Sequence, residues 1–313
     1  MTAATAPPAF VHAAFRYADE EAYLAGIVPF VEEGIAAGHP VLVAVPAERL
    51  ALLRRQFAAR PPVLHFSPME EMGRNPAWII PAWADFLAAH RASGTPVRGI
   101  GEPIWHGRSN DELVECERHE ALLNVAFAQE PDFQLLCPYD SSTLDAAVIE
   151  QAAANHPHVC RLGEGTTAST GFDAAVPDSL DAALPPVPAD AILIRFEGVP
   201  DLRALRLRTA EAAMAAGVDR ARVDDVVVAV CEAVTNSVQH AGGTTTVAQW
   251  GDGRSFVCEV RDRACISDPL AGRVRPPVTQ TGGRGLWVMH QLCDLVQLRK
   301  LPDGQAVRLH VRC

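Results

Sequence analysis

The chain has 313 residues, 49% of them hydrophobic, which is enough for two domains with full apolar cores. Its formal net charge of −11 at pH 7 argues against nucleic acid or an anionic membrane surface as a general partner. The longest apolar runs are too short for a transmembrane helix, so no membrane association is expected. Residues 1–9 lack the basic and then apolar pattern of a signal peptide, and we expect them to form a disordered tail.

Predicted strands and helices alternate through residues 10–162. Asn75 before Pro76 is a typical helix start, and Gly38 after residue 37 is a typical helix end. The predicted strands are 10–16, 41–45, 63–66, 97–101 and 133–137. The predicted helices are 20–37, 47–59, 76–92, 111–128 and 145–154. This alternation predicts an α/β domain with a mainly parallel sheet covered by helices on both faces.

Acidic and aromatic residues follow two of these predicted strands. Ligands of such sheets bind beyond the carboxyl ends of the strands, so these residues are candidates for a pocket. The candidate sensory pocket consists of Glu102, Trp105, His119, Tyr139 and Asp140. An equally good interpretation is that they are ordinary loop residues and a solvated helix face. Residues 10–162 contain no G-x-x-x-x-G-K-[ST] sequence, so no phosphate loop of that kind is expected there.

The first half resembles the MEDS sensory domain, found in regulators of methyl-group metabolism and in bacterial signalling proteins. The resemblance covers about residues 10–159 and rests on Tyr23–Phe30, Gly99–Trp105, Glu115–Asn124 and Cys137–Asp140. It implies a RecA-like fold without a working ATP site. It also implies a regulatory role in which an unidentified small molecule is sensed.

Eight cysteines are scattered along the chain without any C-x-x-C spacing. They are best interpreted as reduced residues of a cytoplasmic protein. Two local groups come near to metal-ligand spacing, Cys116 with His119, and His156 with His158 and Cys160. A structural zinc site needs four ligands, and neither group supplies them locally, so the sequence favours no metal there.

Residues 163–188 are rich in Gly, Thr, Ala and Pro and end in Leu184-Pro185-Pro186-Val187-Pro188. Such a composition predicts a linker. A second domain, residues 189–313, is expected to follow it. This domain opens with a predicted strand at 191–197 and a predicted helix at 202–216 that contains no histidine.

A later predicted helix carries a polar row and an apolar row on opposite sides. Glu232, Asn236 and His240 are spaced four residues apart, so they share one helix face. The apolar row consists of Val223, Val227, Val230, Val234 and Val238. A carboxylate can accept a proton, and oxygen ligands suit Mg²⁺, so the polar row can serve chemistry. Taken alone, it is also the pattern of a solvated helix face.

Two later segments extend this pattern. Residues 257–264 read as a strand that ends on Asp262, whose carboxylate can accept the exocyclic amino group of a purine. Thr281-Gly282-Gly283-Arg284-Gly285-Leu286 leads directly into an apolar helix. Glycines let the backbone approach a phosphate, and a helix start offers free N–H groups.

The order of these features resembles the GHKL ATPase superfamily, and most closely the anti-sigma-factor serine kinases. The likeness covers about residues 184–313 and implies an α+β GHKL (Bergerat) ATP-binding sandwich with ATP and Mg²⁺ as cofactors. By this likeness Glu232 is the general base, Asn236 the Mg²⁺ ligand and Asp262 the adenine-binding carboxylate. The phosphate-side box is Gly282, Gly283, Arg284, Gly285 and Leu286. His240 and Ala264 complete the candidate ATP-binding set, and residues 264–282 would form a mobile lid.

The chain departs from the family pattern at three places. Ala264 stands where the family usually has glycine, and Gly304-Gln305 replaces a Gly-Thr pair. The short lid holds Pro269, Pro276 and Pro277 and no lysine. These departures favour, as one alternative, a nucleotide-dependent binding module without phosphoryl transfer.

The two resemblances together imply a cytoplasmic bacterial signalling protein that acts in transcription regulation. The sensory domain would control an anti-sigma-factor-type serine/threonine kinase domain that phosphorylates or sequesters a protein partner. The partner would be a sigma factor or an anti-sigma-factor antagonist. A sensor histidine kinase-like protein is the other alternative, although it needs a phosphoacceptor histidine before the ATP domain. The sequence leaves open whether the protein forms a homodimer.

Overall fold

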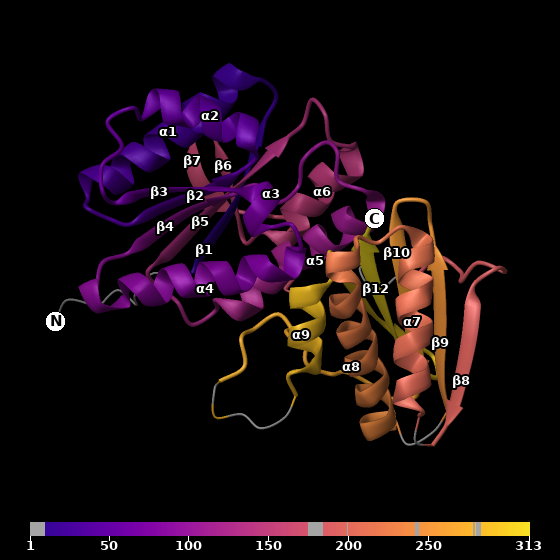
Figure 1. Cartoon of the computed structure of the whole chain (residues 1–313). Helices are drawn as coiled ribbons and strands as arrows, with labels where there is room; N and C mark the ends of the chain where they lie inside the picture. Colours follow the sequence, from indigo (N-terminus) through magenta and orange to yellow (C-terminus); the bar gives the residue numbers. More distant parts are fainter. Residues whose placement is uncertain (1–9, 175–183, 199, 242–243, 278, 280–282) are drawn as a thin grey trace. The chain divides into compact units, whose positions relative to one another are not determined.

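The computed structural model describes residues 10–174, 184–198, 200–241, 244–277, 279 and 283–313. The predicted tail at 1–9 and the box residue Gly282 lie outside this range. The chain divides into two compact units, Met1–Leu180 and Asp181–Cys313 (Figure 1). The division falls within the predicted linker, although residues 165–168 of that linker form the last strand of the first unit.

The first unit contains a seven-stranded sheet in the order β3-β2-β4-β5-β1-β6-β7. All neighbouring strands are parallel except β6 and β7, which confirms the predicted mainly parallel sheet. The strands are β1 (Val11–Tyr17), β2 (Val41–Val45), β3 (Leu64–Pro68), β4 (Val97–Gly101), β5 (Phe133–Asp140), β6 (His158–Arg161) and β7 (Gly165–Ala168).

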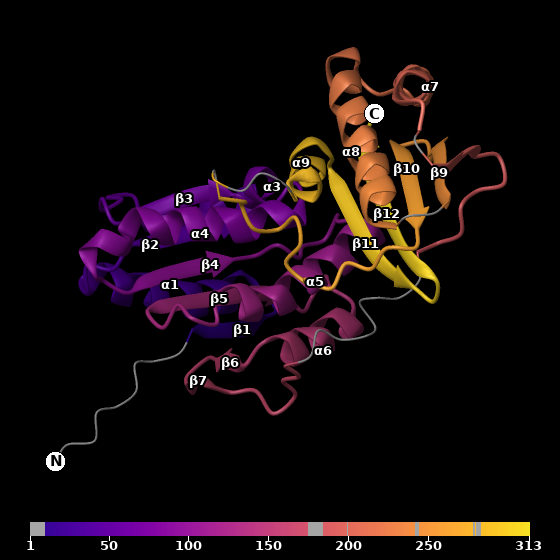
Figure 2. The ribbon, with the colours of Figure 1, turned by 90° about the horizontal axis from the view of Figure 1, so that it is seen from below.

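Helices cover both faces of this sheet. Helices α1 and α2 lie on one face, and α4, α5 and α6 lie on the other (Figures 1 and 2). The helices are α1 (Glu20–Ala36), α2 (Ala47–Gln56), α3 (Met69–Met72), α4 (Ile79–His90), α5 (Asn110–Ala126) and α6 (Ala146–Asn155). Two 3₁₀ segments, η1 (Pro76–Trp78) and η2 (Arg91–Ser93), flank α4.

Helix α1 packs closely on strand β1 because a glycine faces the sheet. A Cβ atom at Gly26 would lie 2.1 Å from Cζ of Phe15, so only glycine fits this contact. Tyr23 and Ile27, which are fully buried, extend the contact along the same helix. The spacing at 20–37 that predicted a helix therefore also placed the apolar face of that helix.

The second unit is a five-stranded antiparallel sheet in the order β11-β12-β10-β9-β8. Its helices α7, α8 and α9 lie together on one face (Figure 1). The strands are β8 (Ile192–Glu197), β9 (Thr244–Gly251), β10 (Ser255–Asp262), β11 (Leu295–Leu301) and β12 (Gly304–Arg312). The helices are α7 (Leu202–Ala216), α8 (Val223–Ala241) and α9 (Gly285–Leu292), and the 3₁₀ segment η4 (Arg220–Arg222) precedes α8.

Helix α8 buries a stripe that is rotated from the predicted valine row. Val227 and Val238 are only half-buried, whereas Ala233 and Ser237 are buried. The hydroxyl of Ser237 forms a 2.6 Å hydrogen bond with the hydroxyl of Thr245 on β9, so a polar contact helps to set the rotation of the helix. The opposite side of α8 remains accessible.

Within the described residues, no helix combines the length and apolar character needed to cross a membrane.

Candidate functional site

Helix α8 presents two polar side chains to the start of helix α9. A Cβ atom at Gly285, the first residue of α9, would lie 2.4 Å from Nδ2 of Asn236 and 2.9 Å from Oε2 of Glu232. Both side chains therefore rest against the bare Cα of Gly285. The four-residue spacing put the carboxylate and the amide on one helix face, and the packing of α9 on α8 brings them to a helix N-terminus.

The rest of the glycine box leads into this helix start. Gly283 has a φ of +72°, a conformation that glycine adopts without strain. Gly283 and Arg284 are exposed, and Leu286 is half-buried beside the apolar core. The exposed Gly283 carries no side chain, so its backbone is one that a phosphate could approach.

Asp262 ends strand β10, as predicted, and the residue is buried, with 7% exposure. Its Oδ1 accepts a 2.7 Å hydrogen bond from the backbone N–H of Ala264. Its Oδ2 lies 3.5 Å from Nε2 of Gln305, which pairs with Asp262 across the β10–β12 ladder. The Gln305 amide thus takes the position beside Asp262 where the family pattern would place a threonine hydroxyl.

Residue 304, next to Gln305, must be glycine because its backbone lies against the backbone of Asp262. A Cβ atom at Gly304 would lie 1.8 Å from the carbonyl oxygen of Asp262. The glycine of the family's Gly-Thr pair is therefore structurally required here, because the β11–β12 turn lies against the end of β10. Ala264, two residues after Asp262, is half-buried.

His240 lies in the last turn of α8, four residues beyond Asn236, and is exposed. The structure therefore leaves it at the end of the polar row, while Glu232 and Asn236 contact α9. A role for His240 in nucleotide binding stays a prediction.

The described part of the predicted lid contacts α9 at two places, Gly272 and Arg275. Gly272, with a φ of +74°, has Leu286 and His290 of α9 so close that a Cβ atom would lie 2.8 Å from each. Arg275 lies over the ring of Trp287, and Arg284 donates a hydrogen bond to the carbonyl of Pro277. The interpretation of this segment as a nucleotide-ordered lid stays a prediction.

These residues fit a nucleotide with its metal ion. Glu232 and Asn236 contact the bare Cα of Gly285, so a carboxylate and an amide border the start of α9. Oxygen donors of this kind suit Mg²⁺, and exposed N–H groups at a helix start suit phosphate. Asn236 and Glu232 would hold the metal side, the Gly283–Gly285 backbone the phosphates, and Asp262 the adenine.

The first unit has a cleft at the carboxyl ends of its parallel strands, with a volume of about 420 Å³. Three predicted pocket residues line it, Glu102, Trp105 and Asp140. Glu102 accepts a 2.7 Å hydrogen bond from the hydroxyl of Tyr17 at the end of β1. Arg49 of α2 forms a 3.3 Å ion pair with Asp140. Tyr17 and Arg49 were not predicted, although the end of the first predicted strand could have indicated the tyrosine.

Two other predicted pocket residues lie elsewhere. The ring of Tyr139 packs edge-on against His156 at 5.6 Å, because alternate residues of a strand point to opposite faces. It borders a second cleft, of about 310 Å³, on the α6 side of the sheet. His119 is buried within α5. The five residues predicted as one pocket are therefore divided between separate places in the unit.

Burial makes Glu102 a titrating group near neutral pH. Desolvation raises the pKa of its carboxyl to about 8, against the opposing effects of the Tyr17 hydrogen bond and of Arg49. The cleft thus holds a carboxyl that is largely protonated at pH 7, and a hydrogen-bond donor is available there.

Glu102 is expected to make stability depend on pH. Between pH 4.5 and about 8 the folded protein keeps a proton on Glu102 that the unfolded chain has lost. Because the folded protein binds this proton more tightly than the unfolded chain does, the free energy of unfolding falls as the pH rises from 4.5 to about 8. The stabilisation is fully present below pH 4.5, and its loss is on the order of a few kcal/mol. Glu102→Gln can keep the Tyr17 hydrogen bond and should flatten this dependence. Urea unfolding at pH 5 and pH 8.5 measures the change in the free energy of unfolding between the two pH values. An equal change in the wild type and in Glu102→Gln would contradict the assignment.

Comparison with known protein families agrees with the division into two units. Residues 11–157 match the MEDS family, the methanogen/methylotroph, DcmR sensory domain. Residues 199–311 match the histidine kinase-like ATPase domain. No curated protein gives a significant match to the chain.

The two matches describe a fusion of a sensory-like domain with a kinase-like ATPase domain. This combination is that of a signalling protein. The ATPase domain implies ATP binding, which in such domains usually involves Mg²⁺. The helices on an antiparallel sheet in the second unit are consistent with this class.

Proposed function

We propose that the second unit is a serine/threonine protein kinase domain of the anti-sigma-factor type. It uses ATP·Mg²⁺ to phosphorylate a protein partner, or sequesters that partner, under control of the first unit. The partner we propose is a sigma factor or an anti-sigma-factor antagonist. Control by the first unit would act through a small molecule bound in the Glu102 cleft.

The observation that carries the proposal is the contact of Glu232 and Asn236 with Gly285. The polar side chains of a solvated helix face point into water, whereas Glu232 and Asn236 pack against a glycine at the start of another helix. Here the bare Cα leaves both side chains bordering the helix N-terminus, and a side chain at residue 285 would displace them. The arrangement supports Glu232 as the base and Asn236 as the metal ligand, next to the backbone that would hold phosphate.

Glu232 has the position and chemistry of a general base. ATP would supply the transferred phosphoryl group, with its charge offset by Mg²⁺. Glu232 would take the proton of the attacking serine or threonine hydroxyl, and Asn236 would hold the metal side of the site in place. Glu232 is half-buried, so part of the residue is accessible to solvent.

The histidine kinase alternative has less support. Such a kinase needs a phosphoacceptor histidine on a helix before its ATP domain. Strand β8 and the single helix α7 come before α8 in this unit, and residues 184–239 contain no histidine.

A binding module without phosphoryl transfer is the second candidate. One observation favours it, since both oxygens of Asp262 already have neighbours from the chain, the Ala264 N–H and the Gln305 amide. An adenine would share this carboxylate with them, which should weaken nucleotide binding.

Incubation of the full chain with γ-labelled ATP, alone and with candidate sigma factors or antagonists, tests the proposal. Label on serine or threonine of a partner supports the kinase. Acid-labile label on histidine of the chain itself would support the histidine kinase instead. Partner binding that depends on ATP but leaves no label would support the binding module. A parallel arm with residues 184–313 shows whether removal of the first unit changes the outcome.

Asn236→Ala is expected to weaken Mg²⁺-dependent ATP binding at least tenfold, because the amide oxygen is the proposed metal ligand. The unfolding midpoint should stay near that of the wild type, since this side chain lies off the buried stripe of α8. Calorimetric titration of the full chain with ATP, with and without Mg²⁺, measures the effect. The exposed Gln239 on the same helix supplies the control, Gln239→Ala. Equal affinities in both variants would remove Asn236 from the site.

A further inference from the structure

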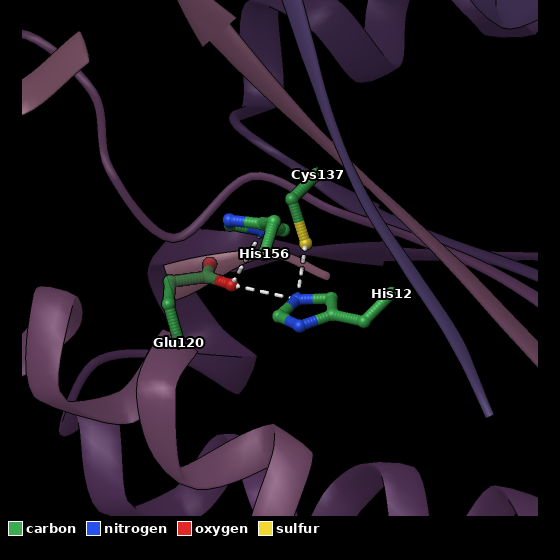
Figure 3. Close-up of side chains that lie close together, drawn as sticks. All are labelled: His12, Glu120, Cys137 and His156. Atoms are coloured by element: carbon green, nitrogen blue, oxygen red, sulfur yellow. Dashed lines mark hydrogen bonds and ion pairs between the residues drawn. The ribbon is translucent and has the colours of Figure 1, made fainter. Parts of the chain in front are cut away.

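Four side chains from distant parts of the first unit converge in its interior. They are His12 of β1, Glu120 of α5, Cys137 of β5 and His156, which follows α6 (Figure 3). All four are buried, with exposures of 0–1%. Their potential ligand atoms, one for each residue, lie within 4.8 Å of one another. No local sequence pattern signals this group, since only His156 belongs to one of the two local groups that come near to metal-ligand spacing.

The hydrogen bonds around His12 fix which ring nitrogen carries a proton. The Asn124 amide donates through Nδ2 to the carbonyls of Ala121 and Asn155, so its Oδ1 faces His12. This oxygen lies 3.0 Å from Nδ1 of His12 and can only accept. Nδ1 of His12 therefore carries the proton, and Nε2 of the neutral ring is a bare lone pair that points to Glu120.

His156 is oriented in the same way. Its Nδ1 lies 2.7 Å from the carbonyl oxygen of Ala152, which also can only accept. Its Nε2 is therefore bare in the neutral ring, and it lies 3.3 Å from Oε2 of Glu120 without a hydrogen bond within the described residues. Metal-binding histidines usually donate the N–H of the ring nitrogen that does not bind the metal to a polar group, as Nδ1 of His12 and of His156 do here.

The ligand atoms lie close together around the Glu120 carboxylate. Oε2 of Glu120 is 3.0 Å from Nε2 of His12, and Sγ of Cys137 is 3.4 Å from that same nitrogen. Oε1 of Glu120 is buried and has no hydrogen-bond partner within the described residues. Two imidazole lone pairs that face a carboxylate repel it unless positive charge lies between them. A proton on one imidazole can bridge to Glu120 along one hydrogen bond only, whereas a metal ion can bind all four groups at once.

We propose that His12, Glu120, Cys137 and His156 bind one divalent transition-metal ion of the zinc class. Metal bonds of 2.0–2.3 Å in a tetrahedral site give ligand–ligand separations of about 3.3–3.8 Å, close to the separations of 3.0, 3.3 and 3.4 Å between these atoms. Two imidazoles, a thiolate and a carboxylate suit Zn²⁺ better than Mg²⁺ or Ca²⁺. The charges of Glu120 and the Cys137 thiolate balance that of the ion, which leaves the buried site neutral.

Metal binding at this place would tie the interior of the first unit together. The four ligands come from β1, α5, β5 and the segment between α6 and β6, so the ion would link two adjacent strands to α5 and to the end of α6. Binding must release the thiol proton of Cys137, since the thiolate is the ligand. The proposal concerns the first unit alone and does not depend on the nucleotide chemistry of the second.

The test starts with the full untagged chain, stripped with a chelator and then titrated with Zn²⁺ and with Co²⁺. We expect one equivalent of metal per chain, a higher unfolding midpoint, and a thiolate-to-cobalt charge-transfer band in the near ultraviolet. Titration calorimetry in two buffers of different ionisation enthalpy should show the release of at least one proton per ion. Less than stoichiometric uptake of both metals, with no band and no change in midpoint, would overturn the proposal.

Variants assign the ligands. Cys137→Ser should lose the charge-transfer band and at least tenfold in affinity, whereas Cys160→Ser, at a half-buried cysteine outside the group, should keep both. Asn124→Leu keeps all four ligands but removes the partner of His12 Nδ1, together with the hydrogen bonds to the carbonyls of Ala121 and Asn155. It should weaken binding about 10–100-fold while the band remains. A band that persists in Cys137→Ser, or that is lost equally in Cys160→Ser, would refute the assigned site. Should Cys137→Ser fail to fold, the wild-type titration and Asn124→Leu still decide the matter.

Discussion

Glu232→Gln is expected to slow phosphoryl transfer or ATP hydrolysis by about 10²–10⁴-fold while nucleotide affinity stays near that of the wild type. Glutamine keeps the size and the oxygen of the side chain but cannot take a proton. The contact with Gly285 should therefore survive, and only the proposed proton transfer is lost. Single-turnover transfer of labelled phosphate, measured beside calorimetric affinity, separates the two effects.

Glu211→Gln is the matched control for this variant, because Glu211 is an exposed glutamate on α7 of the same unit. It should leave both rate and affinity unchanged. Turnover at the wild-type rate in Glu232→Gln would show that Glu232 is not the base. A wild-type protein that binds ATP but transfers no phosphate to any partner would favour the binding module.

Gly285→Ala is expected to slow phosphoryl transfer about 10²-fold, since a displacement of catalytic groups by about 1 Å has effects of this size. It should also weaken Mg²⁺·ATP binding, because the proposed metal ligand moves. The new Cβ would lie 2.4 Å from Nδ2 of Asn236 and 2.9 Å from Oε2 of Glu232, so both side chains must move. Alanine is a better helix former than glycine, and α9 itself should not unfold. Circular dichroism checks the fold, single-turnover transfer measures the rate, and calorimetry measures the affinity.

Gly171→Ala serves as the matched glycine control. A Cβ atom at Gly171 would meet no atom closer than 3.7 Å. This variant should bind nucleotide like the wild type. Unchanged binding in Gly285→Ala would mean that the contact between α8 and α9 has no part in the nucleotide site.

Elements with strong local signals were predicted closely. The strands at 41–45 and 97–101 and the helix at 202–216 have the predicted bounds in the structure. These elements could be predicted because their signals, an apolar run for a strand and a helical spacing that ends at a glycine, involve only residues close together in the sequence. Strands β6 and β7 were missed because they are short, and residues 163–188 read as linker by composition. Their pairing with β1 and with each other is a tertiary contact.

The candidate nucleotide site was predicted in its parts. Glu232 and Asn236 share a helix face by their spacing, and Asp262 ends its strand by the apolar pattern before it. The contact of both α8 residues with Gly285 is set by how α9 packs on α8, and no local signal reports it. The rotation of α8 likewise depends on Thr245 of a neighbouring strand.

The sequence by itself determined the alternation of the first half, the polar row of α8 and the glycine-rich start of α9, because each is a pattern among residues close along the chain. Only the tertiary structure decided which side chains meet. It divided the predicted pocket, since Tyr139 and Asp140 are neighbours on a strand and point to opposite faces. It also joined His12 to Cys137, because β1 and β5 are adjacent parallel strands, and added Glu120 and His156 from the helical layer on that face. Parallel neighbours in a sheet are far apart in sequence, so a site built across them has no local signature.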